Sequence, residues 1–189
     1  MSELESTRPR ADAARVNADP LDEHVLSIEI DVPRQEVWDE ITKTGRIQRA
    51  MMNTLLESEL VPGAKLRYYS PDKKRVYVVG EVIEVTPPKR LKHTYMFTSR
   101  AEVPTIVTWE LEEIATGCRV TLTHSGFTDQ AKTHKDVAGG WRMILDAMKA
   151  ELESGRLGWK TRFMYGLMGA MTFLQPKQTL TDEVEKAGW

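Results

Sequence analysis

The chain has 189 residues, of which 41% are hydrophobic and 29% are charged, and its formal net charge at pH 7 is −2. These values indicate one globular domain with extensions, and the lack of a basic surplus argues against nucleic-acid binding. The single cysteine, Cys118, excludes an intramolecular disulfide and a cysteine metal site, so we expect a small buried side chain in a strand. No apolar signal segment opens the chain, and we expect a cytoplasmic protein.

The first part of the chain predicts a tail, a strand and two helices. Residues 1–22 are polar and free of aromatic side chains, so we expect a disordered or loosely packed tail. Residues 24–31 alternate apolar and polar side chains, which is typical of a half-buried strand. Pro33 suits the first turn of a helix over residues 33–45, and we expect a second short helix over 46–56.

Five further segments have the composition and the turn boundaries of strands. They are residues 64–70, 75–85, 91–99, 103–113 and 118–124. Because hairpin-length loops join most of them, the six strands together predict a curved antiparallel sheet. Gly80 lies in the middle of a long strand segment, a position typical of a bulge or a close backbone approach.

One long amphipathic helix is predicted over residues 136–157. Asp136 is the expected N-cap, and Gly155 is the expected C-terminal stop. Apolar residues recur at helical spacing at Trp141, Ile144, Leu145, Met148 and Leu152. Strands followed by a helix that needs an apolar surface predict an α+β fold in which six strands wrap around the C-terminal helix.

Three segments of the sequence resemble one protein family. They are GEVIEVTPPKRLKHTY (80–95), RVTLTHSGF (119–127) and GGWRMILDAMKAELESG (139–155). Together they resemble the START/Bet v 1-like (SRPBCC) superfamily and, within it, the activator of Hsp90 ATPase homologue (AHSA1-like) family. The resemblance covers a domain over residues 23–157. It implies a helix-grip fold with a cavity between sheet and long helix, which many members use for hydrophobic small molecules.

His124 is the main candidate for chemistry. It continues the inward alternation of Val120 and Leu122, so its ring should reach the predicted cavity, where imidazole suits an acid, a base or a ligand anchor. The alternative is a core histidine bonded to a backbone carbonyl. Glu81 would be a second acid–base candidate only if it faces inward together with Tyr77, whereas solvated strand carboxylates are commoner.

Aromatic side chains supply the expected lining of the cavity. Apolar walls with a few hydroxyls and one imidazole suit a small-molecule pocket, although aromatic side chains also fill ordinary cores. No metal-ligand spacing, phosphate loop or GxSxG motif occurs, so we expect no metal and no cofactor. The predicted ligand-binding residues are Met51, Tyr68, Tyr77, Tyr95, Trp109, His124, Trp141 and Leu145.

Residues 158–189 extend beyond the family domain. From Phe163 to Pro176 they carry no charge, and large apolar side chains recur every four residues from Trp159, which predicts an amphipathic Met-rich helix. This run is too short to span a bilayer. Three interpretations stay open: packing on the domain or over its cavity, a homodimer interface over 158–176, or a membrane surface. Few basic residues flank the run, which makes the membrane the least favoured of the three.

Three functions fit these observations. We favour non-catalytic binding of a hydrophobic small molecule, such as a lipid, an aromatic compound or a polyketide. The first alternative is a cyclase- or hydrolase-like enzyme that uses the same cavity with His124, and Glu81 if it faces inward, as acid and base. The second alternative, which the family name suggests, is a modulator of an Hsp90-type chaperone ATPase.

Overall fold

The computed structural model describes residues 23–127 and 131–189, so the predicted tail over 1–22 lies outside the described residues. Within that part of the chain there are eight strands, four α-helices and two 3₁₀ turns. The strands are β1 (His24–Ile30), β2 (Ile47–Gln48), β3 (Thr54–Glu57), β4 (Lys65–Tyr69), β5 (Val76–Thr86), β6 (Arg90–Phe97), β7 (Thr105–Ile114) and β8 (Gly117–Ser125). The helices are α1 (Arg34–Ile41), α2 (Ala131–Ser154), α3 (Trp159–Ala170) and α4 (Thr181–Lys186), with the 3₁₀ turns η1 (Thr172–Leu174) and η2 (Lys177–Thr179).

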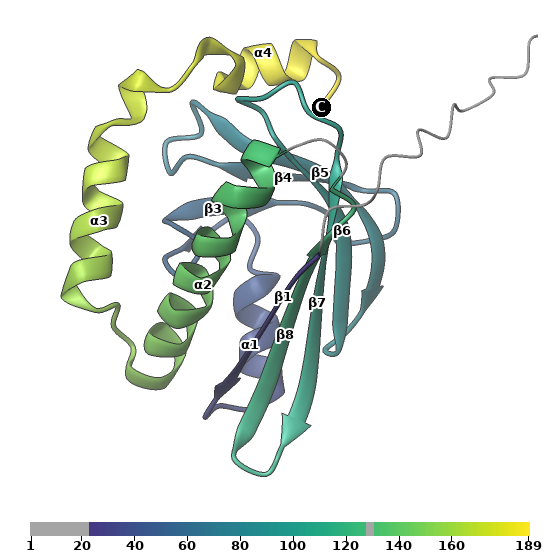
Figure 1. The fold of residues 1–189 in the computed structure, drawn as a ribbon, viewed down its shortest axis with the longest axis vertical. Coiled ribbons are helices and arrows are strands. Elements are labelled where there is room, and N and C mark those ends of the chain that lie inside the picture. The colour runs from purple at the N-terminus through teal and green to yellow at the C-terminus, as the bar shows by residue number, and fades with distance from the viewer. Residues whose placement is uncertain (1–22, 128–130) are drawn as a thin grey trace, which may run out of the picture.

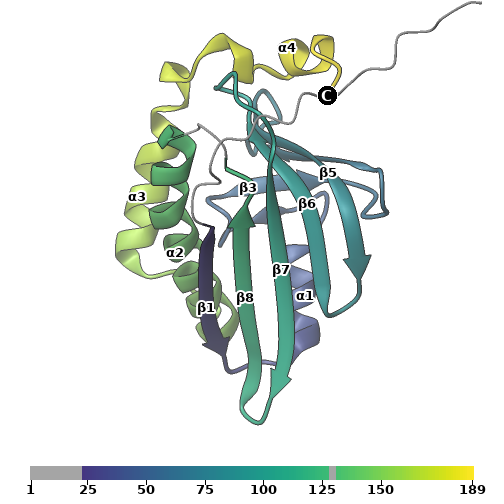
Figure 2. The same cartoon turned by 45° about the vertical axis from the view of Figure 1, so that its right-hand side comes forward.

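The described strands form one sheet in the order β1-β8-β7-β6-β5-β4-β3-β2, and every neighbouring pair is antiparallel. The sheet curls around α2, and α1 packs against β7 and β8 near one end (Figures 1 and 2). Alternate side chains of each strand face the concave side. In β8 these are Cys118, Val120, Leu122 and His124, all of them fully buried. The predicted α+β architecture, a curved antiparallel sheet around a C-terminal helix, is confirmed.

The predicted count of six strands is wrong, because residues 46–56 form the short strands β2 and β3 instead of a helix. Leu55 of β3 pairs with Tyr69 of β4 and so adds this segment to the edge of the sheet. Between β2 and β3 the chain turns through Met52 and Asn53, whose φ angles are +56° and +57°. Two successive left-handed residues are incompatible with a right-handed helix. Only α1 therefore lies between β1 and β2.

Helix α2 begins at Ala131, before the predicted Asp136, whose carboxylate forms an ion pair with Arg100 instead of capping the helix. The predicted stop at Gly155 is confirmed, because its φ is +69° and its N–H donates to the Glu151 carbonyl at 2.8 Å. A left-handed residue directly after the last turn is a common way for a helix to end. The apolar side of α2 lies on the concave face of the sheet.

Buried side chains form two clusters on opposite faces of the sheet. The main core lies between the concave face, α1 and α2. On the other face, Val184 of α4 covers a smaller cluster of Leu55, Tyr69, Val76 and Val79. This second cluster holds the C-terminal segment against the outside of the sheet.

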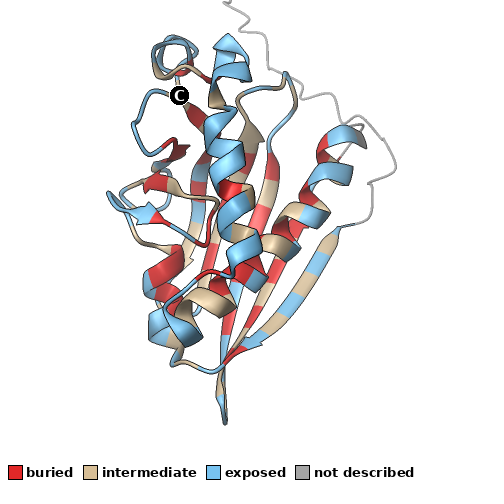
Figure 3. Ribbon diagram, turned by 90° about the vertical axis from the view of Figure 1, so that its left-hand side faces the viewer, coloured by how far each residue is buried: buried red, intermediate tan, exposed pale blue. Residues whose placement is uncertain are grey.

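Residues 158–189, the C-terminal extension, form α3, the two 3₁₀ turns and α4. Helix α3 runs along the outer side of α2, and most of its surface is exposed (Figures 1 and 3). Its one buried residue, Tyr165, donates from Oη to the Ala50 carbonyl at 3.2 Å. Further along, Arg75 Nη1 donates to Thr179 Oγ1 at 2.6 Å. None of the described helices is long and apolar enough to cross a membrane.

Candidate functional site

The predicted ligand-binding residues meet on the concave face beneath α2, although they come from separate elements. The ring centroid of Trp141 on α2 is 5.7 Å from that of Tyr95 on β6 and 5.8 Å from that of Trp109 on β7. Tyr77 differs from the others, because it is only partly buried and packs at the margin of the main core. The buried members of the set are Met51, Tyr68, Tyr95, Trp109, His124, Trp141 and Leu145.

His124 is hydrogen-bonded at both ring nitrogens. The Trp141 Nε1–H donates to Nδ1 at 2.8 Å, which makes Nδ1 an acceptor and leaves the ring proton on Nε2. The Nε2–H then donates to Thr105 Oγ1 at 2.7 Å, and that hydroxyl donates to the Tyr95 carbonyl at 3.0 Å. The partners are thus an indole and a hydroxyl, where a backbone carbonyl was the expected alternative. The chain of bonds joins α2 to β6, β7 and β8 and fixes the ring.

The surroundings of His124 keep its imidazole neutral. Burial lowers the pKa of His124 to about 3, and the neighbouring rings of His93, His24 and His134 act in the same direction. A neutral imidazole with both nitrogens occupied has no free position for a proton. The geometry therefore gives His124 a positioning role toward Trp141 and Thr105.

One fully buried polar atom of the concave face, Nε2 of His93, has no hydrogen-bond partner among the described residues. The buried side chains of Tyr68 and Tyr95 belong to the same core. Burial raises the pKa of both tyrosines, and it lowers the pKa of His93 to about 4. The phenols therefore keep their protons. Because His93 Nδ1–H donates to the Thr94 carbonyl at 2.7 Å, its Nε2 is an acceptor. The concave face thus offers two O–H donors and one nitrogen acceptor.

His93 is a candidate that the sequence analysis missed. It lies between Leu91 and Tyr95 in the inward alternation of β6, and all three residues are buried. The same period-two argument that identified His124 on its strand would have found His93 here. His93 and His124 both stand opposite Val107 of β7, one on each side of it.

Glu81 lies outside the site, which agrees with the commoner solvated carboxylate and not with the inward alternative. Its side chain is exposed, whereas Tyr77 packs at the margin of the core. The reason is a bulge: β5 carries Tyr77 as an extra residue opposite the step from Tyr68 to Tyr69 on β4. An extra residue breaks the alternation of faces, so residues on either side of it no longer share a face by parity.

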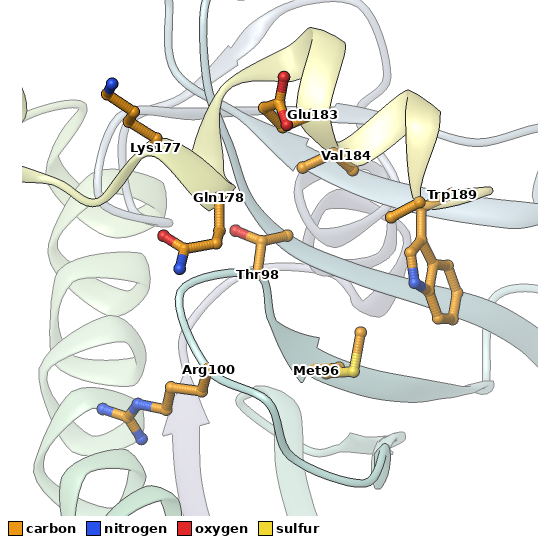
Figure 4. Close-up of a pocket in the computed structure, with 9 residues that line it drawn as sticks. Met96, Thr98, Arg100, Lys177, Gln178, Glu183, Val184 and Trp189 are labelled. Carbon is orange, nitrogen blue, oxygen red and sulfur yellow. The ribbon is translucent and has the colours of Figure 1, made fainter.

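Two surface pockets lie where the C-terminal extension meets the domain, and neither contains a predicted ligand-binding residue. The first, of about 660 Å³, lies between β6 with its following loop and the C-terminal segment (Figure 4). Its lining includes Met96, Thr98, Arg100, Gln178, Glu183 and Trp189. The second, of about 380 Å³, lies beside α3 and contains Arg49, Arg156 and Arg162. No group of His, Cys, Asp and Glu side chains in the described part of the chain could hold a metal ion.

Comparison with known proteins gives a family match and a set of similar folds. The family model described as Activator of Hsp90 ATPase homolog 1-like protein matches residues 31–153. A search of curated protein sequences returned no significant match. Among solved structures, DynU16 from the dynemicin biosynthetic locus is similar with a TM-score of 0.61 and 22% identity over 73% of this chain and 49% of that chain.

Two further structures carry names from the Hsp90 field. The Aha1 dimer from Colwellia psychrerythraea has a TM-score of 0.60 and 16% identity, over 72% of this chain and 99% of that chain. PFC0360w, an HSP90 activator from Plasmodium falciparum, has a TM-score of 0.57 and 20% identity, over 70% of this chain and 96% of that chain. At such identities these similarities concern the fold alone.

Proposed function

Because the chain belongs to the family of Activator of Hsp90 ATPase homolog 1-like proteins, we propose that its helix-grip domain binds a hydrophobic small molecule between the concave face of the sheet and α2. The observation that carries this proposal is the buried Nε2 of His93, which has no partner and lies in an aromatic core that also holds the phenols of Tyr68 and Tyr95. Leaving a buried polar atom without a hydrogen bond costs about 1–3 kcal/mol. A ligand that supplies the missing partner would recover that free energy.

The chemistry of these atoms restricts the ligand. The two phenol hydroxyls are donors, so they favour a carbonyl, ether or hydroxyl oxygen on the ligand. The His93 Nε2 lone pair favours a ligand hydroxyl or N–H. Around them the walls are apolar and aromatic, with Trp109 and Trp141 at right angles to each other. A lipid, an aromatic compound or a polyketide-like molecule with a few oxygens fits this combination.

Binding requires core side chains to move apart, and the β2–β3 turn is the element best suited to do so. Met51 in that turn is 5% exposed and belongs to the main core, and Met52 packs against the same core. Methionine side chains are unbranched and adapt to differently shaped neighbours. Across the core, Ile144 of α2 keeps 8% exposure. We propose that the ligand enters between this turn and α2.

The two alternative functions have weaker support. An enzyme that used His124 as acid or base would first have to break its bond to Trp141 or Thr105, and Glu81 does not face it. Modulation of an Hsp90-type ATPase rests on the family description and on fold similarity to PFC0360w and the Aha1 dimer. A pull-down with purified Hsp90 that recovers this chain at a defined stoichiometry would favour that second alternative.

Titration with the hydrophobic fluorescent dye anilinonaphthalene sulfonate tests the proposal, since its sulfonate accepts hydrogen bonds and its rings are apolar. We expect saturable binding that Tyr68→Phe and Tyr95→Phe each weaken by about three- to tenfold, as expected for one lost hydrogen bond. Tyr69→Phe is the matched control, because Tyr69 neighbours Tyr68 on the opposite face of the sheet. If Tyr68→Phe and Tyr69→Phe weaken dye binding equally, the dye does not bind at the concave face.

A further inference from the structure

Helix α3 exposes a continuous row of large apolar side chains, on a surface separate from the concave face of the sheet. Trp159, Phe163 and Leu167, spaced four residues apart, lie on one side of the helix and are 74%, 71% and 52% exposed. Beyond the helix, Phe173 and Leu174 are 76% and 62% exposed. Single exposed apolar side chains are ordinary on protein surfaces, but a row of this size marks an interaction site.

The domain itself does not cover this row. The opposite side of α3 is the packed one, because Tyr165 is buried and Met164 contacts the main core. Before the helix, Leu157 is buried in that core. After it, Arg75 holds Thr179 by the hydrogen bond described above, and an isolated bridge joins Arg75 to Leu180. Fixed at both ends and along one side, α3 presents its apolar row outward. Figure 3 shows that most of this helix is exposed.

The charges in the segment of chain that carries the row are all of one sign. From residue 154 to residue 181 the charged side chains are Arg156, Lys160, Arg162 and Lys177, with no Asp or Glu among them. Arg162 precedes Phe163 by one residue and Lys160 precedes it by three, so the two cations flank the apolar row on opposite sides of the helix. Neither Arg156 nor Arg162 forms an ion pair with another described residue. An apolar row between basic flanks is typical of a helix that lies in a membrane interface.

A pocket beside the row adds a place for an anionic group. It measures about 380 Å³ and brings Arg156 and Arg162 together with Arg49. Arg49 is already paired with Glu151, which leaves the other two guanidinium groups to balance a negative charge. Guanidinium groups bind phosphate oxygens through two hydrogen bonds at once. The pocket therefore suits the phosphate of a lipid headgroup.

We propose that the exposed face of α3 docks on the surface of a bilayer that contains anionic phospholipids. Trp159, Phe163 and Leu167 enter the interface between headgroups and acyl chains, and Arg156 and Arg162 bind lipid phosphates. The aromatic side chains suit this depth, because their rings favour the boundary between apolar and polar layers. On the sequence alone the membrane is the least favoured of three interpretations, because few basic residues flank the uncharged run. We now favour the membrane, because all of these few flanking charges are basic.

A second copy of the chain fits the same face less well. Closed homodimers use the same patch on both subunits, so residues near the twofold axis face their own copies. Pairing two α3 faces would bring the basic flanks of both helices together without an acidic partner from residues 154–181. An anionic bilayer has the opposite charge and draws the same residues toward it.

Flotation of the full-length protein with lipid vesicles tests this proposal. We expect binding to vesicles of phosphatidylcholine mixed with phosphatidylglycerol, weaker binding to phosphatidylcholine alone, and loss of binding at high salt. Arg156→Gln and Arg162→Gln should each lower the partition constant about fivefold. Phe163→Ser should lower the partition constant about tenfold, because the variant has no phenyl ring to transfer from water into the bilayer on binding.

Two control variants test whether the loss of vesicle binding is specific to the exposed face of α3. Val61→Ser removes an apolar side chain that is 50% exposed elsewhere, and Lys135→Gln removes an exposed charge from α2. Neither should change vesicle binding. Absence of binding to all vesicles would overturn the proposal. A stable dimer in solution that Phe163→Ser converts to a monomer would overturn it as well and assign the face to a second copy.

Discussion

At the scale of single residues, the concave face holds two histidines in different situations. His124 has a partner at each ring nitrogen, whereas His93 has one on Nδ1 and none on Nε2. Both rings are kept neutral by burial, which lowers the pKa to about 3 and about 4. His124 therefore belongs to the framework of the site, and His93 is the imidazole with a lone pair free for a ligand.

The stability of the protein should depend on these histidines below pH 6.5. Their pKa in the folded chain lies below the unfolded value of 6.5, so between the two values the unfolded chain binds protons that the folded core excludes. Their stabilising contribution is complete above pH 6.5 and is lost as the pH falls toward 4. Each should reduce the free energy of unfolding by about 1.4 kcal/mol per pH unit in that window.

Urea unfolding of the wild type and of His93→Leu at several values between pH 7 and pH 5 measures this effect. The variant should lose stability less steeply with falling pH, since one of the two excluded protons is gone. At pH 7 it should lose about 1 kcal/mol, because Nε2 has no bond to lose but the bond from Nδ1 to the Thr94 carbonyl is removed. His24 and His134, which lie near His124, are present in both proteins. Parallel pH curves for the two proteins would contradict the assignment.

The residue scale also shows where sequence patterns stop being informative. Alternation along β8 correctly placed His124 inward, and the same rule applied to β6 would have found His93. The rule failed for Glu81, because the bulge at Tyr77 changes which residues face inward. A bulge depends on the pairing of two strands, and a pattern within one strand does not reveal it.

At the scale of elements, the close approach of β5 and β6 depends on Gly80. A Cβ built at this position would lie 2.0 Å from the Thr94 carbonyl oxygen, so the glycine expected to mark a close backbone approach does so. Gly80→Ala should lower the free energy of unfolding by about 2 kcal/mol or more, because the backbone of β6 has to shift. Gly139→Ala is the matched control on α2, where nothing lies within 4 Å of a new Cβ. It should raise stability by about 0.5–1 kcal/mol.

Thermal and urea unfolding of both glycine variants provides the measurement. Opposite signs of the two changes are the expected outcome. A Gly80→Ala protein as stable as the wild type would show that β5 and β6 can separate there without cost, and the register between them would need revision.

The longer elements were predictable from the sequence, and the two shortest strands were not. Strands of seven or more residues and the 24-residue helix α2 repeat their period often enough to be recognised. Strands β2 and β3 have two and four residues, and partners far along the chain hold them in place. The start of α2 was placed late, because Asp136 looks like an N-cap but pairs with Arg100 from the β6–β7 loop.

At the scale of the whole molecule, the C-terminal extension joins the two faces of the sheet. It leaves the main core after α2, follows the outside of that helix as α3 and ends over the second cluster through Val184 of α4 (Figures 1 and 2). The sequence predicted an amphipathic helix here but did not decide whether its apolar side contacts the domain, a second copy of the chain or a membrane. Which side packs on the domain follows only from the contacts of Tyr165 and Met164.

Ligand binding beneath α2 is tested most directly by native mass spectrometry. The full-length protein is mixed with fatty acids, flavonoids and aromatic polyketides. We predict one bound small molecule per chain, released on denaturation. The adduct should be lost in the double variant Tyr68→Phe, Tyr95→Phe and retained in Tyr69→Phe and in Phe163→Ser. The last variant separates the concave face from the exposed face of α3. A chain that stays at its bare mass with every compound, or an adduct that Phe163→Ser alone abolishes, would contradict a ligand site beneath α2.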